Sequence, residues 1–240
     1  MYARDLRYES RLALTGRWGI AIVAALLAGL LGGAMGFNSG SLNIELDQET
    51  LRRIPDSLKP LLLGYLGFAG FYGTVLFIIG GVIRLGYCRF LLNMQDSRNP
   101  DLKDIFSRFD RFGDGFLLSL FTGLFTALWM LLFIIPGIVA AYSYAMAPFI
   151  MEENPEMKAM DAIRASKAMM YGHKAELFVL DLSFLGWTIL CILSLGIGFF
   201  WLNPYRASAY AAFYRRLNPA GFATPAIPEQ NPGWHEDQVN

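Results

Sequence analysis

Residues 115–151 read GFLLSLFTGLFTALWMLLFIIPGIVAAYSYAMAPFIM and contain no charged side chain. As one helix, this stretch would be about 55 Å long, because an α-helix rises about 1.5 Å per residue. The hydrocarbon core of a bilayer is only about 30 Å thick, so one crossing takes about 20 residues. Pro136-Gly137 lies inside the stretch, and proline breaks the interior of a helix. The stretch therefore predicts two membrane helices, 115–135 and 137–151, joined as a tight hairpin.

Four other segments are nearly as apolar: 18–37, 61–83, 177–193 and 195–214. The last two are separated by Ser194-Leu195-Gly196, a turn sequence, and their only charges are Asp181 and Arg206. Charged residues make up 17% of the chain, against about 25% in soluble domains. We therefore predict an all-α polytopic membrane helix bundle, with six transmembrane helices in three hairpins. The alternative for 137–151 is a re-entrant segment that does not cross fully.

The basic residues predict an orientation for these helices. Of the 20 Lys and Arg residues, only Arg52, Arg53 and Lys59 lie in the first loop, 38–60. The others lie in the N-terminal segment, in the two loops expected on the same side, or at the C-terminal end. Positive charge is enriched on the cytoplasmic side of membrane proteins, so we expect both termini there. The segment 18–37 is longer than the apolar core of a signal peptide, which indicates an uncleaved first helix.

Two short amphipathic helices are expected at the inner surface. Both inner loops begin with Asn-Pro-acid, at Asn99 and Asn154, which is typical of a helix N-terminus. The apolar positions are Leu102, Ile105, Phe106 and Phe109 in the first and Met160, Ile163 and Met170 in the second, which stops at Gly172. Their mixed charge favours connectors that rest on headgroups or pack on the bundle over lipid-sensing helices. We expect one membrane domain, 1–217, and a proline-rich, disordered cytoplasmic tail, 218–240.

Glycines are spaced regularly in the first two predicted helices. They are Gly29, Gly32, Gly33 and Gly36 in the first and Gly64, Gly67, Gly70 and Gly73 in the second. Small residues let helix backbones approach closely in lipid. We expect them to pack these two helices together within one chain, with a dimer face as the alternative.

The sequence predicts no catalytic residue, metal or cofactor. Acidic and basic residues are equal in number, 20 each, so the composition does not indicate nucleic-acid binding. The two Cys and two His are too few for a disulfide framework or a His/Cys metal site. Glu152-Glu153, followed by Glu156, superficially resembles the paired glutamates of a membrane protease but lacks an intramembrane His. We therefore expect a protein that is not an enzyme.

The embedded charges form the candidate site. Asp181 and Arg206 lie about 10 and 13 Å from the inner ends of two helices joined by a tight turn, so they can form an ion pair. Arg84 is the second candidate partner of Asp181. With nearby polar residues, the candidate intramembrane cluster comprises Asp181, Arg206, Arg84, Tyr142, Tyr144 and Asn203. A pocket there, made by the second, fourth, fifth and sixth helices, would suit an anionic headgroup or small solute. A purely structural ion pair is the other interpretation, and the one that we favour.

Several segments resemble a known family. They are Phe133–Phe149, Ala162–Lys174, Leu180–Trp187, Leu195–Gly198, Trp201–Tyr205 and Ala211–Tyr214. They are similar to the domain of unknown function 975 family, multi-pass proteins of bacterial plasma membranes, and the likeness is strongest over 128–216. The resemblance implies a location and a span count but no reaction or catalytic residue. A distant likeness to the membrane domain attached to some glycerophosphodiester phosphodiesterases favours lipid or envelope work.

These patterns together predict a multi-pass protein of the bacterial plasma membrane. We expect it to act in the envelope without catalysis, through the lipid bilayer, a membrane-protein partner or a homo-oligomer. A small transporter with a polar pocket in the inner leaflet is the alternative.

Overall fold

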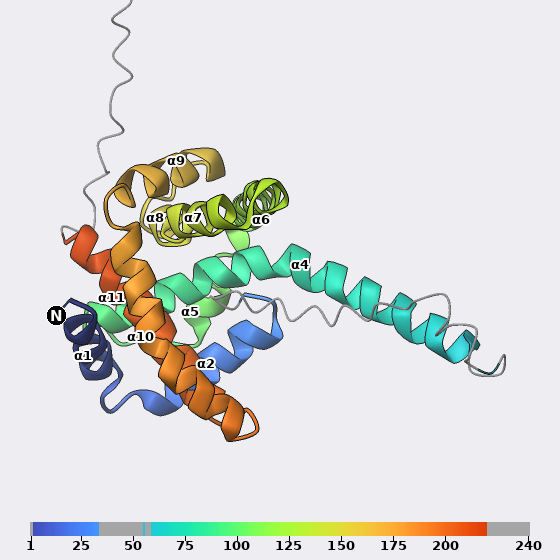
Figure 1. Ribbon diagram of the computed structural model, residues 1–240, viewed down its shortest axis with the longest axis horizontal. Coiled ribbons are helices and arrows are strands. Elements are labelled where there is room, and N and C mark those ends of the chain that lie inside the picture. Colours follow the sequence, from blue (N-terminus) through green and yellow to red (C-terminus); the bar gives the residue numbers. More distant parts are fainter. Residues whose placement is uncertain (1, 34–54, 56–58, 220–240) are drawn as a thin grey trace, which may run out of the picture.

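The described part of the chain is entirely helical (Figure 1). A computed structural model describes residues 2–33, 55 and 59–219. Its helices are α1 (Tyr2–Leu14), α2 (Trp18–Leu30), α4 (Lys59–Gln95), α5 (Lys103–Phe106), the 3₁₀ turn η1 (Phe109–Arg111), α6 (Phe112–Leu132), α7 (Ile134–Tyr144), α8 (Ala147–Glu153), α9 (Ala159–Met169), α10 (Lys174–Leu193) and α11 (Phe199–Leu217). The glycine at 36, most of the first loop and the predicted tail from residue 220 on lie outside the described residues.

Four stretches of helix are long and apolar enough to cross a membrane: Gly70–Gln95, Lys103–Leu132, Ile134–Glu153 and Lys174–Leu193. A fifth is reached if α1 and α2, which are bent by 102° at their junction, count as one span. Alone, α2 has 13 residues, about 20 Å, which is short of a bilayer core. The polar residues of α11 lower its hydropathy. The all-helical class is confirmed, while the count of six crossings remains a prediction.

The N-terminal segment is an ordered helix rather than a plain charged leader. Leu6, Ser10 and Leu14 are fully buried on one face of α1, which packs against α10 and α11. The turn to α2 contains Gly16 with a φ of +75°, a conformation that favours glycine. An amphipathic helix followed by a sharp bend into an apolar one is typical of a segment at a membrane surface.

Helix α4 corrects the predicted end of the second membrane helix at residue 83. The helix continues to Gln95, so Arg84 and Arg89 lie within it instead of in a loop. Arginine is a good helix former, and here Arg89 lies 3.6 Å from the Asp104 carboxylate, which offsets its charge. The first half of α4 projects away from the body (Figure 1). The second half crosses the core and presents Arg84 to the helices around it.

Of the three predicted hairpins, two have their turns within the described residues, and the turn between α6 and α7 comes earlier than expected. Helix α6 ends at Leu132, Phe133 is extended with φ −157° and ψ 141°, and α7 begins at Ile134. Pro136 therefore belongs to the first turn of α7, where its missing N–H costs no helical hydrogen bond. The second hairpin turns at Leu195 and Gly196, both with positive φ, as the sequence predicts.

The segment predicted at 137–151 is divided between two helices. Helix α7 ends at Tyr144, and α8 begins at Ala147 with Pro148 in its first turn. Pro148 cannot donate a helical hydrogen bond, and the start of α8 is a position where none is needed. Pro204, by contrast, lies inside an unbroken α11.

The first predicted amphipathic helix does not form as one continuous helix, so this prediction is wrong. Only α5, of 4 residues, and the turn η1 form, and Phe106 and Phe109 are exposed while Ile105 is buried. The Asp104 carboxylate accepts a hydrogen bond from Asn93 of α4, which ties the loop to the bundle. The second forms as α9, which buries Ala162, Ile163 and Ser166 against the bundle, so it is packed on the protein.

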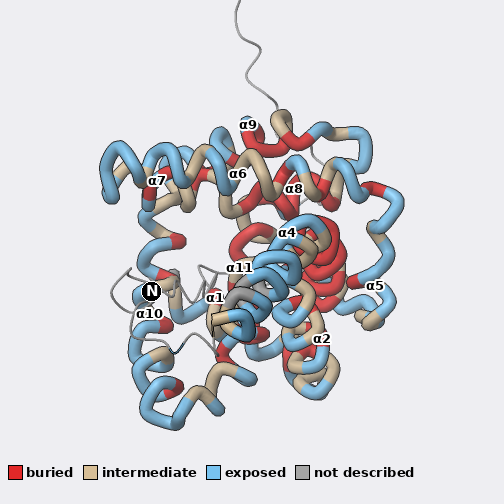
Figure 2. The backbone as a smooth tube through the Cα atoms, turned by 90° about the vertical axis from the view of Figure 1, so that its right-hand side faces the viewer, coloured by how far each residue is buried: buried red, intermediate tan, exposed pale blue. Residues whose placement is uncertain are grey.

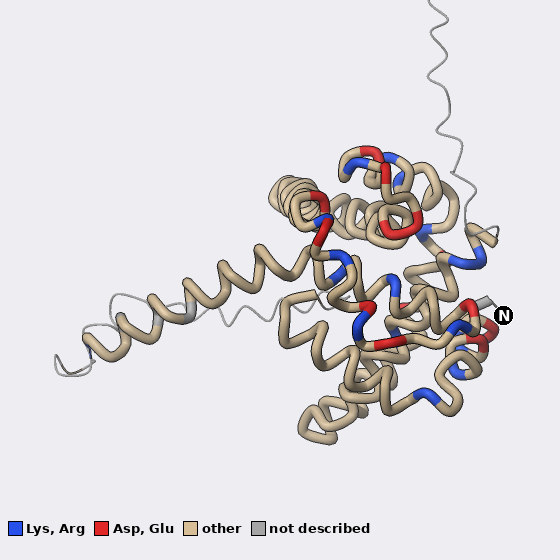
Figure 3. Tube along the Cα trace, turned by 180° about the vertical axis from the view of Figure 1, so that it is seen from behind, with Lys and Arg blue, Asp and Glu red and all other residues tan. Residues whose placement is uncertain are grey.

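The core lies where the helices cross, and the helix ends beyond it are exposed. Figure 2 shows buried backbone in the inner half of α4 and in α8 and α11. Among the largest buried side chains are Tyr87, Phe149 and Tyr214, and the rings of Phe149 and Tyr214 stack at 5.3 Å. Figure 3 shows the charges gathered around this body, while residues 60–83 and the far ends of both hairpins carry none.

Glycines bring α2 and α6 close to α4. A Cβ on Gly32 would lie 2.7 Å from the Leu76 carbonyl oxygen of α4, and Gly81 of α4 lies against Gly115 of α6. The expected packing of the first two helices is therefore present at Gly32. Within the described residues, the series Gly64 to Gly73 takes no part in it, because a Cβ at any of these glycines would meet none of their atoms within 4 Å.

Candidate functional site

Asp181 lies at the centre of a polar cluster contributed by three helices. Arg206 of α11 donates from Nε to Asp181 Oδ1 at 3.0 Å, and its Nη2 is also 3.0 Å from Oδ1. The hydroxyls of Tyr210 and Tyr142 donate to Oδ2 at 2.7 and 2.9 Å. The expected ion pair with Arg206 is thus present, together with a hydrogen bond from Tyr142 of α7.

The local sequence explains why these side chains meet. The positive-φ turn at Leu195 and Gly196 folds α11 back along α10, so Asp181 and Arg206 lie side by side. Tyr210 follows Arg206 by four residues, which places both on one face of α11. The Tyr142 ring packs edge-to-face on Phe178 at 6.0 Å, which holds α7 against α10. Tyr210 was missed from the sequence, although its i+4 spacing from Arg206 was the available signal.

Beside this cluster lies a cavity of about 380 Å³ between α4, α6, α7 and α11, which we call the four-helix cavity. Its polar lining residues are Arg84, Ser119, Thr122, Thr126, Tyr142, Tyr144, Arg206 and Tyr210. The lining contains no Asp, Glu, His, Cys or Lys. Asp181 stands behind Arg206 and the two tyrosines. The pocket expected from the sequence therefore exists, with α6 lining it in place of α10.

Arg84 lies on the wall of the four-helix cavity rather than on Asp181. Its Nε is inaccessible to solvent and has no hydrogen-bond partner among the described residues. Three side chains occupy the acceptor positions of Asp181, and Arg84 is not one of them. Arg84, the second candidate partner of Asp181, therefore has no acidic partner among the described residues.

The remaining two predicted residues are separated. Tyr144 lines the four-helix cavity, where its ring lies 6.4 Å from that of Phe125. Asn203 instead lines a small cavity of about 100 Å³ beside α2, with Ile22, Leu26 and Phe199 among its neighbours. Asn203 therefore belongs to a different surface of α11 from the cluster.

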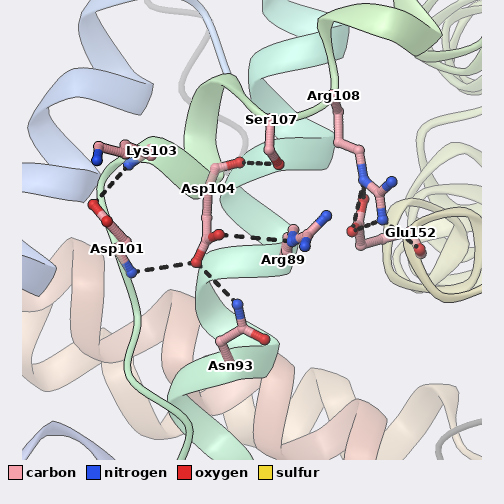
Figure 4. Close-up of polar contacts among 8 residues, drawn as sticks. All are labelled: Arg89, Asn93, Asp101, Lys103, Asp104, Ser107, Arg108 and Glu152. Carbon is pink, nitrogen blue, oxygen red and sulfur yellow. Dashed lines mark hydrogen bonds and ion pairs between the residues drawn. The ribbon is translucent and has the colours of Figure 1, made fainter.

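A second polar region, missed from the sequence, lies at the C-terminal ends of α4, α8 and α11. Figure 4 shows Arg108 turned toward Glu152, to which it donates from Nε at 2.9 Å and from Nη2 at 2.6 Å. Arg89 and Asn93 of α4 point toward the Asp104 carboxylate in the same view. Glu152 is only 5% exposed, so its charge depends on Arg108. These contacts bind α4, the α5 loop and α8 together.

Arg215 closes this region at the end of α11. It pairs with Glu153 and lies 2.6 Å from the Asp96 carboxylate. Burial alone would lower the pKa of the Arg215 guanidinium, but Glu153 and Asp96 raise the pKa above its ordinary value. A cavity of about 460 Å³ lies among these residues. Both glutamates of the protease-like sequence are therefore held in ion pairs.

The four-helix cavity offers groups that can bind a ligand. No group of three or more His, Cys, Asp or Glu side chains in residues 2–33, 55 and 59–219 is placed to hold a metal ion. The four-helix cavity offers guanidinium groups and hydroxyls, which donate hydrogen bonds. The lining contains no His and no carboxylate, the side chains that most often act as general bases.

A comparison with protein families agrees with the sequence resemblance. Residues 130–220 match the model of a family described as "Protein of unknown function (DUF975)". The match covers α7 to α11, including Tyr142, Asp181, Arg206 and Tyr210, and begins after Arg84. No curated protein and no solved structure matches the chain. Residues 130–220 of this chain are therefore similar to the DUF975 family of proteins of unknown function.

Proposed function

We propose that this chain is a non-enzymatic, multi-pass protein of the bacterial plasma membrane that binds a lipid or a membrane partner. The four-helix cavity is the binding site in this proposal. In it, α2 and α11 cross the membrane along with the four more apolar helices, and both termini lie in the cytoplasm. The observation that carries the proposal is an open cavity between apolar helices, lined by arginine guanidinium groups and by hydroxyls that can donate hydrogen bonds to a ligand.

The exposed surface supports a membrane location. Large apolar side chains cover the outer ends of both hairpins, for example Leu131 at 86% exposure and Leu195 at 93%. Apolar patches of this extent would promote aggregation in water but are satisfied by lipid chains. The same surface leaves room for a membrane-protein partner or a second copy.

A small transporter is the second candidate, and the break between α7 and α8 favours it. Transporters commonly bind their substrates where a membrane helix is discontinuous. Here Tyr144 and Ala145, at the end of α7, line the four-helix cavity. Transport would require that the cavity opens in turn to each side, so water access to Arg206 from both sides would favour this function over binding alone.

Filling the four-helix cavity tests the proposal. Gly123 of α6 lines it, and a Cβ there would meet nothing within 4 Å, so a Gly123→Leu side chain begins in open space beside the cavity. Gly186 of α10 is the matched control, because a Cβ there also meets nothing and Gly186 lies outside the lining. Both changes gain about the same helix propensity, up to about 1 kcal/mol.

The measurement is native mass spectrometry of the full chain purified from its membrane, with quantification of the bound lipids and partners. We expect Gly123→Leu to lose at least one specifically bound species that Gly186→Leu retains. Equal retention by the two variants would show that the cavity is not the binding site.

A further inference from the structure

We propose that the four-helix cavity binds an anionic group, a phosphate or a carboxylate, on the guanidinium of Arg84. The inference rests on the proposed function, because it specifies the ligand of the same cavity. It places the anion between Arg84 of α4 and the polar residues of α6 and α7. The anion is either the headgroup of a lipid or a free small ion, and the two sources share this chemistry.

The distribution of charge around the cavity supports an anion. Arg206 is neutralised by Asp181 at 3.0 Å, so this pair contributes no net charge. Arg84 has no carboxylate within ion-pair distance in the described part of the chain, and arginine stays protonated in proteins. The lining also lacks any acidic side chain. One uncompensated positive charge therefore faces the cavity, where the surrounding apolar helices screen it poorly.

The hydrogen-bonding groups of the lining point to the same class of ligand. Tyr142 and Tyr210 already donate their protons to Asp181, and Thr122 donates to the Leu118 carbonyl oxygen. The hydroxyls of Ser119 and Tyr144 carry no hydrogen bond within the described residues and remain able to donate. With Arg84, they form a set rich in donors, which suits phosphate or carboxylate oxygens.

The same lining residues disfavour a cationic or an entirely apolar ligand. A cation would lie beside Arg84 with no carboxylate in the lining to hold it, because Asp181 is already occupied by three donors. An entirely apolar ligand would leave the charge of the Arg84 guanidinium uncompensated. An anionic ligand in the cavity would neutralise that charge.

Substitution of Arg84 tests this inference. We would use the full chain in nanodiscs of phosphatidylcholine and follow thermal unfolding by tryptophan fluorescence. The two probes are inorganic phosphate in the buffer and phosphatidylglycerol added to the nanodisc lipid. The variants are Arg84→Gln, which removes the charge, and Arg84→Lys, which keeps it. Arg164→Gln is the matched control, because Arg164 lies on α9 with 70% of its side chain exposed.

We expect at least one probe to stabilise the wild-type chain, and the probe that does so identifies the source of the anion. For that probe, Arg84→Gln should weaken the apparent affinity at least 10-fold, while Arg164→Gln leaves it unchanged and Arg84→Lys retains most of it. Without a probe, Arg84→Gln should unfold at the same temperature as the wild type or higher, because an uncompensated buried charge is removed. These two results together support the inference.

Three results would overturn it. The first is that neither probe stabilises the wild-type chain. The second is that Arg84→Gln and Arg164→Gln have the same apparent affinity for the probe. The third is a large loss of stability or failure to fold in Arg84→Gln, because that would show Arg84 to be held by a structural partner. The Gly123→Leu variant tests the proposed function separately. If Gly123→Leu loses a ligand that Arg84→Gln retains, the cavity is a binding site but its ligand is not an anion held by Arg84.

Discussion

Removal of the Asp181 carboxylate should destabilise the bundle more than any other change to the polar cluster. Asp181 is 12% exposed and accepts hydrogen bonds from Arg206, Tyr142 and Tyr210. Breaking a buried ion pair by removing one partner typically costs about 3–5 kcal/mol, because the other charge stays buried. Arg206 is 34% exposed, so water can solvate part of its charge. For Asp181→Ala we therefore expect the lower end, about 3 kcal/mol.

A double-mutant cycle separates the ion pair from the two tyrosine contacts. The double variant with Asp181→Ala and Arg206→Ala no longer strands the guanidinium, so it should recover part of the loss. We expect a coupling energy of about 2 kcal/mol, which is within the range for residues in one network. We assign the stability loss that remains in the double variant to the hydroxyls of Tyr142 and Tyr210, which no longer have a charged hydrogen-bond acceptor.

The assay is reversible unfolding in mixed micelles with increasing dodecyl sulfate, followed by tryptophan fluorescence. Asp161→Ala is the control, because Asp161 forms an exposed pair with Arg164 at 3.6 Å and should lose less than about 1 kcal/mol. Two results would refute the reasoning: an Asp181→Ala variant as stable as the control, or single changes whose losses simply add.

Four further predictions test the rest of the structure. Glu152→Ala should cost about 3 kcal/mol in the same assay, because it strands the partly buried Arg108; no loss would show that this pair does not join α8 to the α5 loop. Gly81→Ala should cost about 1–3 kcal/mol, because its Cβ would fall on the Gly115 carbonyl oxygen, whereas Gly123→Ala should not destabilise the chain. Tyr205→Phe should cost about 1 kcal/mol, because it removes the hydrogen bond from Arg11 Nε at 3.1 Å; a neutral change would mean that this contact does not help to hold α1. Single cysteines at 105, 165 and 230 should resist a membrane-impermeant reagent added from outside, and a cysteine at 50 should react; labelling at 165 would contradict the six-crossing topology.

The helical class and the central ion pair could be predicted because each depends on a strong local signal. Long runs without charge predict membrane helices whatever their partners are. Asp181 and Arg206 interrupt two such runs that are joined by a short turn, so their contact follows from chain geometry. Tyr210 could have been found in the same way, because it lies one helical turn beyond Arg206.

The four-helix cavity and the inner charge network depend on tertiary packing, which local patterns do not contain. The charge of Arg84 was expected to mark the end of a helix, but α4 continues for another 11 residues, to Gln95, and carries Arg84 into the core. Glu152 resembles a loop residue in the sequence, and only the approach of Arg108 from the α5 loop allows its burial. The turn was predicted at Pro136 but lies at Phe133, because Pro136 fits the first turn of α7.

The prediction of an amphipathic helix in the first inner loop was also wrong, for a physical reason. The i, i+3, i+4 and i+7 pattern from Leu102 to Phe109 predicts a continuous amphipathic helix. In the structure, Asp104 is bound by α4 and Arg108 turns toward α8, so the loop exchanges helical hydrogen bonds for contacts with the bundle. Tertiary contacts outweighed a weak local preference.

The most direct test of the central claim is a crystal structure of the full chain grown in a lipidic mesophase that contains phosphatidylglycerol and phosphate. We predict electron density for an anionic group in the four-helix cavity, within hydrogen-bond distance of the Arg84 guanidinium, with Asp181 still paired to Arg206. A cavity that holds only water, or an Arg84 guanidinium paired with a carboxylate of this chain, would contradict it.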